Sequence, residues 1–378
     1  MQQPSWYRQP GVSLFVHAPV RACQDGDVLL CEKDGQPQTW MLLSGGLVPI
    51  ALRHDAPTDR HLDRGAVCAI AWSPDGKRFI SAAQDNVMYL RTIGRQFSSS
   101  NYSRHGGTFV HAVSWSPDGT RIASGDNHDE LHVWDVWDVA EETTTHPRGD
   151  ASLGRILVCR TRERLLSCQG ILATSWSPNS HFVATGGRSG EVRLWDVNTG
   201  RLMWTRLAHQ GNVHALAWSP DGAFLASAGS DMTVQVWQVL SHKTWYDIGE
   251  TTQGELQALA WSPDGTSLLL CGTGSQALRL YDAHRGQRSR QIPLSRYGAS
   301  AGVHAVSWSP DGRFAAAGCA DGSVQIVDVE QSKHIRTFHG HTGITSAVAW
   351  SPDGAHIASG GIDKRVLVWN VTANTEQP

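Results

Sequence analysis

The pentapeptide Trp218-Ser219-Pro220-Asp221-Gly222 decides the fold, because it recurs along the chain at a nearly constant spacing. Complete copies begin at Trp72, Trp115, Trp218, Trp261, Trp308 and Trp350, and a weaker copy, Trp-Ser-Pro-Asn-Ser, begins at Trp176. The intervals between these seven copies are 43, 61, 42, 43, 47 and 42 residues. A recurring unit of about 42 residues is typical of repeat architectures, in which each unit buries an apolar face against the next.

Each unit predicts a four-stranded antiparallel meander, and the fourth unit shows this best. Residues 213–218 alternate small and large apolar side chains, as a strand does. Ser219-Pro220-Asp221-Gly222 fits a type I turn, with proline at the second position and glycine at the fourth. Apolar strands over 223–228 and 233–237 follow, and a looser fourth strand precedes the next unit.

The tryptophan that opens each pentapeptide is expected to lie between neighbouring units. A lone meander cannot bury both of its faces, so the units must stack. A buried tryptophan removes about 150–250 Å² from water, which contributes about 4–6 kcal/mol at most. Seven such residues in equivalent places predict one closed ring, although a length of 378 residues alone suggests two or three domains.

Composition excludes several classes of protein. Apolar residues make up 40% and charged residues 18%, which excludes a disordered chain. The net charge is −3, and the sequence has no basic run that would favour nucleic acid. No apolar run reaches membrane-spanning length, and residues 1–10 do not suggest a signal peptide. The seven cysteines form no C-x-x-C pair, so we expect a cytoplasmic protein without metal or cofactor.

The units resemble the WD40-repeat family, whose repeats have a 40–45-residue period. The resemblance covers about residues 48–370 and rests on Val133-Trp134-Asp135, Leu194-Trp195-Asp196, Val368-Trp369-Asn370 and Gly340-His341. It implies an all-β fold, a seven-bladed β-propeller of four-stranded antiparallel blades. The near-identical pentapeptides are similar to those of bacterial members of the family.

The resemblance also sets the expected domain boundaries. Residues 1–47 form a non-repeat, β-rich extension with strands near 12–17, 27–31 and 39–43. This extension is expected to cap the ring or to lie along its rim, and an atypical eighth blade is the alternative. The propeller spans 48–370, where 48–53 supplies the closing strand of the last blade; 139–154 is a flexible insertion loop, and 371–378 is a polar tail. The blade cores are expected near 66–91, 109–135, 171–196, 212–238, 255–282, 302–328 and 344–370.

Members of the family often carry a buried hydrogen-bonded set of His, Ser or Thr, Asp and Trp within a blade. Two complete sets occur here, His209, Ser227, Asp231 and Trp237 in the fourth unit and His341, Ser359, Asp363 and Trp369 in the seventh. The second unit has His128 at the Asp position, and His105 lies one residue out of register. We interpret the sets as structural, because the serines lie within strands and not on the exposed turn that a nucleophile needs.

The resemblance places partners on the face that carries the loops before each first strand, around the central channel. The position four residues before each pentapeptide tryptophan is predicted to lie at the channel mouth, and it holds Cys68, His111, Leu172, His214, Gln257, His304 and Ser346. The three histidines lie on alternate blades, too far apart to share a metal ion. They either line a wet channel or recognise an acidic group more strongly when protonated.

Two further rows of loop residues are expected on the same face. One row holds Ala66, Phe109, Ile171, Asn212, Glu255, Gly302 and Ile344, and the other holds Gln84, Asn127, Arg188, Ser230, Gly274, Ala320 and Ile362. The ring brings the seventh, first and second blades together, so apolar members of these rows are expected to be near neighbours there. The predicted partner-contacting residues are therefore Phe109, His111, Arg188, His214, His304, Ile344 and Ile362.

The expected function is a non-catalytic scaffold that binds a protein or peptide partner. Gly272-Thr273-Gly274 lacks the lysine and following helix of a phosphate-binding loop, and no other catalytic or metal motif occurs, so no enzyme is expected. One alternative is a sensor subunit that recognises a ligand or nucleic-acid end within a larger bacterial signalling or defence system. Another is an enzyme with its site in residues 1–47 or 139–154.

Overall fold

The computed structural model describes residues 12–14, 28–33, 36–43, 46–49, 59–63, 65–93, 99–102, 105, 108–136, 153–159, 170–241, 243–249, 254–294 and 302–371. All regular secondary structure in these residues consists of β-strands, and all strand pairs are antiparallel. The chain divides into two units, Pro57–Thr372 and a smaller one made of Met1–Ala56 with Ala373–Pro378.

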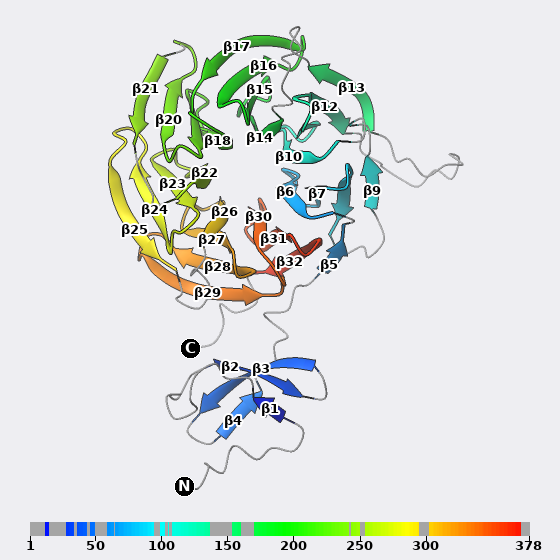
Figure 1. Cartoon of the computed structure of the whole chain (residues 1–378), viewed down its shortest axis with the longest axis vertical. Helices are drawn as coiled ribbons and strands as arrows, with labels where there is room; N and C mark the ends of the chain where they lie inside the picture. The colour runs from blue at the N-terminus through cyan, green and yellow to red at the C-terminus, as the bar shows by residue number, and fades with distance from the viewer. Residues whose placement is uncertain are drawn as a thin grey trace, which may run out of the picture. The chain divides into compact units, whose positions relative to one another are not determined.

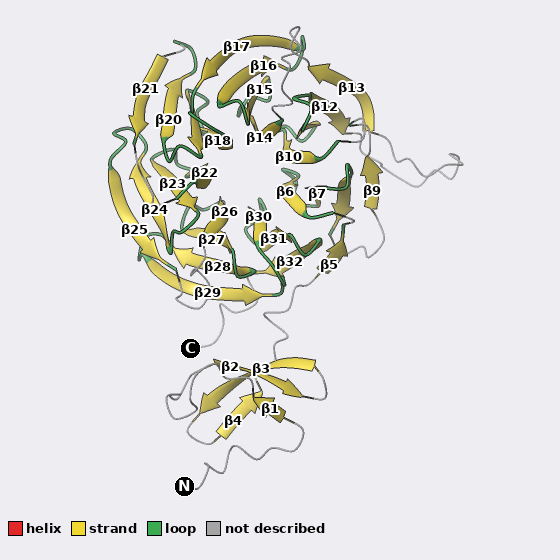
Figure 2. Ribbon diagram, in the orientation of Figure 1, coloured by secondary structure: helices red, strands yellow, loops and turns green. Residues whose placement is uncertain are grey.

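The larger unit is a seven-bladed propeller, as the sequence predicts. Its seven four-stranded sheets surround a central axis, and each runs from an innermost to an outermost strand (Figures 1 and 2). Blades 1 to 3 are β6 (Val67–Trp72), β7 (Arg78–Ala83), β8 (Met88–Thr92) and β9 (Ser99–Tyr102); β10 (Val110–Trp115), β11 (Arg121–Asp126), β12 (Leu131–Val136) and β13 (Leu153–Cys159); and β14 (Ile171–Trp176), β15 (Phe182–Gly187), β16 (Glu191–Asp196) and β17 (Arg201–Leu207).

The other four blades repeat this plan, except that the last takes its outer strand from the N-terminal side of the ring. They are β18 (Val213–Trp218), β19 (Phe224–Gly229), β20 (Val234–Gln238) and β21 (Lys243–Ile248); β22 (Leu256–Trp261), β23 (Ser267–Gly272), β24 (Ala277–Asp282) and β25 (Arg288–Pro293); β26 (Val303–Trp308), β27 (Phe314–Cys319), β28 (Ser323–Asp328) and β29 (Lys333–His339); and β30 (Thr345–Trp350), β31 (His356–Gly361), β32 (Arg365–Asn370) and β5 (Asp59–Leu62).

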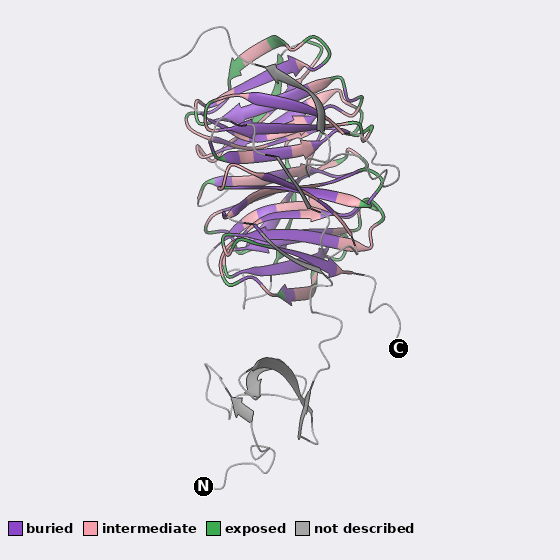
Figure 3. Cartoon of the chain, turned by 90° about the vertical axis from the view of Figure 1, so that its right-hand side faces the viewer, coloured by how far each residue is buried: buried purple, intermediate pink, exposed green. Residues whose placement is uncertain are grey.

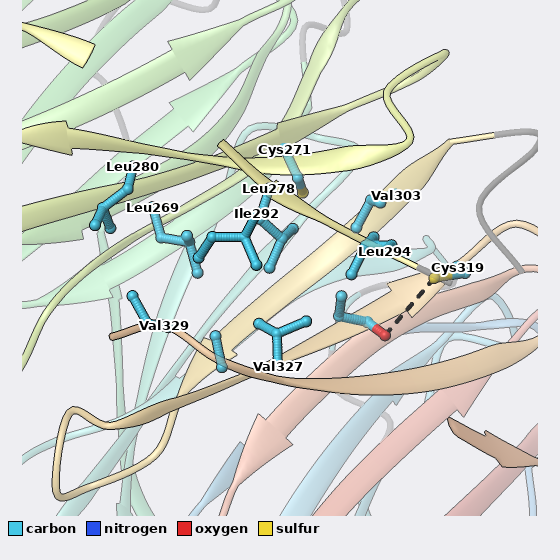
Figure 4. Packing of buried hydrophobic residues seen from close by; sticks show 12 residues of the cluster. Leu269, Cys271, Leu278, Leu280, Ile292, Leu294, Val303, Cys319, Val327 and Val329 are labelled. Atoms are coloured by element: carbon cyan, nitrogen blue, oxygen red, sulfur yellow. Dashed lines mark hydrogen bonds between the residues drawn. The ribbon is translucent and has the colours of Figure 1, made fainter. Parts of the chain in front are cut away.

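The core lies between blades, because both faces of each blade pack against a neighbour. Second strands such as β19 are buried along almost their whole length, whereas the outer strand β17 is mostly exposed (Figure 3). Between blades 5 and 6, Leu269 and Ile292 share one apolar cluster with Val327 (Figure 4). The blades approach so closely that a Cβ on Gly125 would lie 2.3 Å from Ile171 of the next blade.

The opening tryptophans join neighbouring blades. The indole Nε1 of Trp218 donates to the carbonyl of Ser175 in the preceding blade at 3.2 Å, and Trp72 donates to Ala349 across the closure at 2.9 Å. Trp176, Trp261 and Trp308 make the equivalent bond to the preceding blade. Trp115 and Trp350 instead donate to glycine carbonyls of their own turns. Each indole is largely buried, so these contacts also supply apolar area.

The Ser-Pro-Asp-Gly turns are held by their own side chains. In blade 4 the Ser219 hydroxyl donates to Asp221 at 2.5 Å and accepts the Phe224 amide at 2.9 Å. Gly222 donates its amide to the Ser219 carbonyl at 2.9 Å and adopts φ 71°, a region that favours glycine. The hydrogen bond from Ser219 lowers the pKa of Asp221, which therefore stays ionised and keeps accepting the Ala223 amide.

The ring closes through an N-terminal strand, but not through the one that the sequence predicts. The outer strand of blade 7 is β5, which pairs with β32 through Leu62 opposite Arg365 and Asp59 opposite Val368. The predicted closing segment, 48–53, is wrong: Val48 lies in β4 (Gly46–Pro49), which pairs with β3. An edge strand needs only one hydrogen-bonded neighbour, so the polar segment Asp59–Leu62 serves although it has little apolar pattern.

The smaller unit contains one four-stranded sheet of β1 (Val12–Leu14), β2 (Val28–Lys33), β3 (Gln36–Leu43) and β4, paired in chain order. This sheet and the seven blades belong to different units of the chain. Most of the predicted insertion loop, residues 137–152, and all of the tail after residue 371 lie outside the described residues, while β13 includes the last two loop positions.

We predict that Trp218→Ala destabilises the propeller by about 3–5 kcal/mol, because it empties a buried wedge and removes an inter-blade hydrogen bond. Thermal unfolding followed by circular dichroism measures the loss. Leu240→Ala is the control, since Leu240 is 89% exposed and should leave the melting temperature nearly unchanged. A Trp218→Ala melting curve that superimposes on the wild type would contradict the wedge role.

Deletion of residues 1–56 is expected to leave the ring closed, because β5 remains. Deletion of residues 1–62 removes β5 and exposes the free edge of β32, which is expected to cause aggregation and a lower melting temperature. Light scattering and thermal unfolding of the two deletions measure the difference. Equal, monomeric behaviour of both would show that β5 does not close the ring.

Candidate partner-binding face

The meander places two kinds of loop on one face of the ring, which we call the loop face. The Ser-Pro-Asp-Gly turns join the first and second strands on the opposite face. The loop face therefore carries the segments before each first strand and the turns between second and third strands (Figure 1). The predicted partner-contacting residues all belong to these segments or to the adjoining ends of the first strands.

Every innermost strand carries a one-residue bulge at its loop-face end. In blade 2, Val110 lies opposite Asp126 and Ala112 lies opposite Gly125, so His111 is the extra residue. A bulge redirects a side chain and increases the local twist. The seven bulged residues are Cys68, His111, Leu172, His214, Gln257, His304 and Ser346, the positions that the sequence places at the channel mouth.

The three histidines of this row are half-buried, and they differ in their partners. His111 Nε2 lies 2.9 Å from Asn127 Oδ1. His214 Nε2 lies 3.6 Å from Glu255 Oε2, too far for a hydrogen bond. Burial lowers the pKa of His111, His214 and His304, so all three are neutral at pH 7. The row therefore gains positive charge only on acidification.

The two further rows of loop residues pair with each other across the tips of the blades. In blade 7 the Ile362 amide donates to the Ile344 carbonyl at 3.0 Å, and Asn127 donates to Phe109 in the same way at 3.2 Å. In blade 3 the prediction of Ile171 for this row is wrong. Arg188 pairs with Gly170 instead, and Ile171 is a buried residue of β14. In blade 5 Glu255 pairs with Thr273, and not with Gly274.

Several of the predicted contact residues are exposed on the loop face. Phe109 is 44% exposed, Ile362 is 48% exposed, and Arg188 is also exposed, whereas Ile344 is half-buried. The Phe109 ring lies edge-on to His111 at 6.4 Å between centroids. The two isoleucines lie side by side on blade 7, and blade 1 separates them from Phe109 on blade 2. Apolar side chains of the loop face therefore lie on both sides of blade 1.

Buried hydrogen-bonded sets tie the loop face to the blade cores. In blade 7, His341 Nε2 lies 2.8 Å from Ser359 Oγ and Nδ1 lies 3.0 Å from Asp363 Oδ1, while Trp369 donates to Ser359 at 2.8 Å. His209 in blade 4 makes the equivalent contacts to Ser227 and Asp231 at 2.6 and 2.9 Å, and Trp237 is buried beside them. The serine hydroxyls are buried and accept or donate within the blade, as a structural set requires.

The second blade also has a complete set, which the sequence analysis did not recognise. His105 Nε2 lies 2.8 Å from Ser124 Oγ, and Nδ1 lies 3.1 Å from Asp126. Asp126 therefore fills the acidic position in place of His128, because the set is defined by geometry and tolerates a shift along the chain. Trp134 completes it with a 2.7 Å bond to Ser124.

The first blade replaces the set with an ion pair. Asp63 lies at the His position and Arg91 at the Trp position, and they form a buried salt bridge. Arg91 Nη1 also donates to Ser81 at 2.6 Å, and Ser81 donates to Asp63 at 2.9 Å. Both carboxylate oxygens of Asp63, the Ser81 hydroxyl and both terminal nitrogens of Arg91 thus have partners. Such pairing is the condition for a buried polar network to stabilise a fold.

Among the described residues, His105, Asp126 and His132 form the one group whose spacing approaches that of a metal site. The rings of His105 and His132 are stacked, with 4.1 Å between centroids and 26° between planes. Each nitrogen lone pair lies in the plane of its own ring, so two stacked rings direct their lone pairs along nearly parallel planes, which is unfavourable for binding one ion. Both nitrogens of His105 already face Ser124 and Asp126, so the arrangement fits a structural set better than a metal centre.

Three exposed apolar residues outside the loop face were missed by the sequence analysis. Met203, Trp245 and Ile335 are the bulged residues of the outer strands β17, β21 and β29, and they are 52%, 55% and 48% exposed. Trp245 leans on Phe224 with 5.7 Å between ring centroids. Strand alternation alone gives no signal for a bulge, so their exposure was not predictable from the pattern.

The family comparison agrees with this geometry. The family model described as WD domain, G-beta repeat matches six stretches, residues 58–90, 97–135, 161–196, 200–238, 291–328 and 332–370. The chain belongs to the WD40-repeat family. WD40 propellers commonly bind protein partners and generally act as non-catalytic scaffolds. The three inner strands of blade 5 lie between the fourth and fifth matched stretches, and blade 5 carries Tyr281 where blades 2, 3, 4 and 7 have tryptophan.

The matched WD40 stretches are offset from the blades. The stretch 58–90 begins with β5, the outer strand of blade 7, and continues into β6 to β8 of blade 1. Each repeat therefore supplies the outer strand of one blade and the inner strands of the next. Within the residues that the structure describes, no helix has the length and hydropathy of a bilayer span.

We predict that the WD40 propeller loses stability as the pH falls from 7.5 to 5.5. Burial lowers the pKa of His304, so the unfolded chain takes up a proton near pH 6.5 while the folded chain does not. Stability is therefore complete above pH 6.5 and declines below it. Urea unfolding at several pH values measures this, and His304→Asn should reduce the slope. A slope that His304→Asn leaves unchanged would contradict the assignment.

Proposed function

We propose that this WD40 propeller is a non-catalytic platform, and that a protein or peptide partner docks on its loop face around the central channel. The row of seven bulged residues carries the proposal, because every blade turns one side chain at the same end of its innermost strand. The proposal also includes the bacterial origin and the cytoplasmic location that are expected from the sequence.

The surroundings of this row have the composition of an interface. Phe109 and Ile362 offer exposed apolar side chains, and Arg188 offers an exposed guanidinium on the blade next to Phe109. Aromatic and arginine side chains contribute most to binding energy at protein interfaces. The loops stand on a closed ring of packed blades, which lowers the entropy lost on binding. Neutral histidines between them favour hydrogen bonds over strong charge attraction at pH 7.

The experiment begins with capture of the partner from the native host by the full chain, followed by titration of the purified partner. Ile362→Ala and Arg188→Ala are each expected to weaken binding about five- to tenfold. Ile335→Ala is a matched control, because Ile335 has the same 48% exposure but lies on the outer strand β29. Its affinity should stay within twofold of the wild type.

Two results would contradict the proposed platform. One is an Ile335→Ala variant that loses as much affinity as Ile362→Ala, which would place the partner on the rim of the ring. The other is reproducible recovery of a small molecule without any protein partner, which would favour a ligand sensor.

A further inference from the structure

An arginine between blades 4 and 5 has no counter-charge among the residues that the structure describes. Arg279 lies on β24 and is half-buried, and its Nε and Nη1 atoms are buried without a hydrogen-bond partner. Within the described part of the chain, no salt bridge includes Arg279. A buried polar group left unpaired destabilises the folded state, and a charged one does so more strongly. Such a group requires an explanation, and a missing ligand is one.

The third blade shows what an arginine at this position normally binds. Arg193 lies two residues before Trp195, as Arg279 lies two residues before Tyr281, and both occupy the third residue of the third strand. Arg193 donates to Glu191 at 2.8 Å and forms a second ion pair with Asp129 of the preceding blade. These two carboxylates raise the pKa of Arg193 and neutralise its charge despite burial.

Both carboxylates are replaced at the blade 4–5 boundary. Ala277 stands where blade 3 has Glu191, since each is the first residue of its third strand. Met232 stands where blade 2 has Asp129, and the two share a left-handed backbone, with φ 64° and 65°. Arg279 thus keeps the position of Arg193 without its acidic partners. Burial and the nearby charge of Arg288 accordingly lower the pKa of Arg279.

Neighbouring residues on the same face add polar character to this boundary. Gln291 lies directly opposite Arg279, and Arg288 lies opposite Tyr281, so all four side chains share one face of blade 5. The fold does use Arg290, on the other face, because its Nη1 donates to the Glu330 carbonyl at 2.5 Å. Within the described part of the chain, Nε and Nη1 of Arg279 make no equivalent contact.

We propose that Arg279, supported by Arg288 and Gln291, forms an anion-recognition site between blades 4 and 5 that takes a carboxylate from an acidic segment of a partner protein. The bound carboxylate occupies the role that Glu191 and Asp129 fill for Arg193. This site is separate from the channel mouth, and the experiments that test it do not depend on the proposed platform function.

The direct test uses a fluorescein-labelled hexaglutamate peptide, with hexaglutamine as the uncharged probe. We expect the full chain to bind hexaglutamate, and Arg279→Gln to weaken binding at least fivefold. Arg290→Gln is the control for net charge on the same strand pair and should stay within twofold. Equal binding to wild type and Arg279→Gln would overturn the proposal.

A second variant tests whether carboxylates placed on the chain itself replace the bound anion. Met232→Asp combined with Ala277→Glu restores the two carboxylates of the blade 2–3 boundary, so it should raise the melting temperature by several degrees and reduce hexaglutamate binding at least fivefold. Unchanged stability and binding in this double variant would overturn the equivalence with Arg193.

One further measurement distinguishes another source of the anion. Sodium phosphate, compared with sodium chloride at equal ionic strength, should displace hexaglutamate only weakly. Complete displacement would identify a site for free anions and overturn the assignment to an acidic segment.

Discussion

The structure depends on the tryptophan indole that lies between each blade and its neighbour. A four-stranded meander leaves two apolar faces, and the opening tryptophan covers part of both by lying at the boundary. Its N–H finds an acceptor in the preceding blade in five of the seven units, for example from Trp218 to Ser175. A buried indole N–H without an acceptor would cost stability, so the same bond that satisfies the donor also fixes the spacing between blades. The ring geometry, and the alignment of loops on one face, follow from this repeated contact.

The sequence predicted those features that repeat, and it failed where one unit departs from the others. The pentapeptide and its period predicted the blades, and the row of positions assigned to the channel mouth coincides with the bulged residues of the innermost strands. The closing strand was misplaced because Asp59–Leu62 is a polar edge strand without an apolar pattern. The set of His105 with Asp126 was missed because hydrogen bonds depend on distance and tolerate a shift of register. Ile171 was assigned to a loop although it is buried, since blade 3 pairs Gly170 with Arg188.

Departures from the repeat also separate structural from functional candidates. Blade 1 has Asp63 and Arg91 in place of the histidine set, and both carboxylate oxygens and both terminal guanidinium nitrogens have partners, so the exchange preserves the core. Blade 5 has Arg279 at the position of Arg193, but no described residue pairs with it as an acidic partner, so two nitrogens of this charged group are buried without a hydrogen bond. A comparison of the blades with one another therefore serves as an internal control, which identifies an unusual residue without any related protein.

The pairing of β5 with β32 has a consequence for synthesis. The two strands are separated by about three hundred residues of chain, so β5 is synthesised long before the strand with which it pairs. Until residues 365–370 leave the exit tunnel, six blades can assemble while β5 remains unpaired and the first blade lacks its neighbour. Contacts between such distant segments form slowly, and partly assembled chains with free strand edges are prone to aggregate. The nascent ring therefore keeps free strand edges until blade 7 has been synthesised.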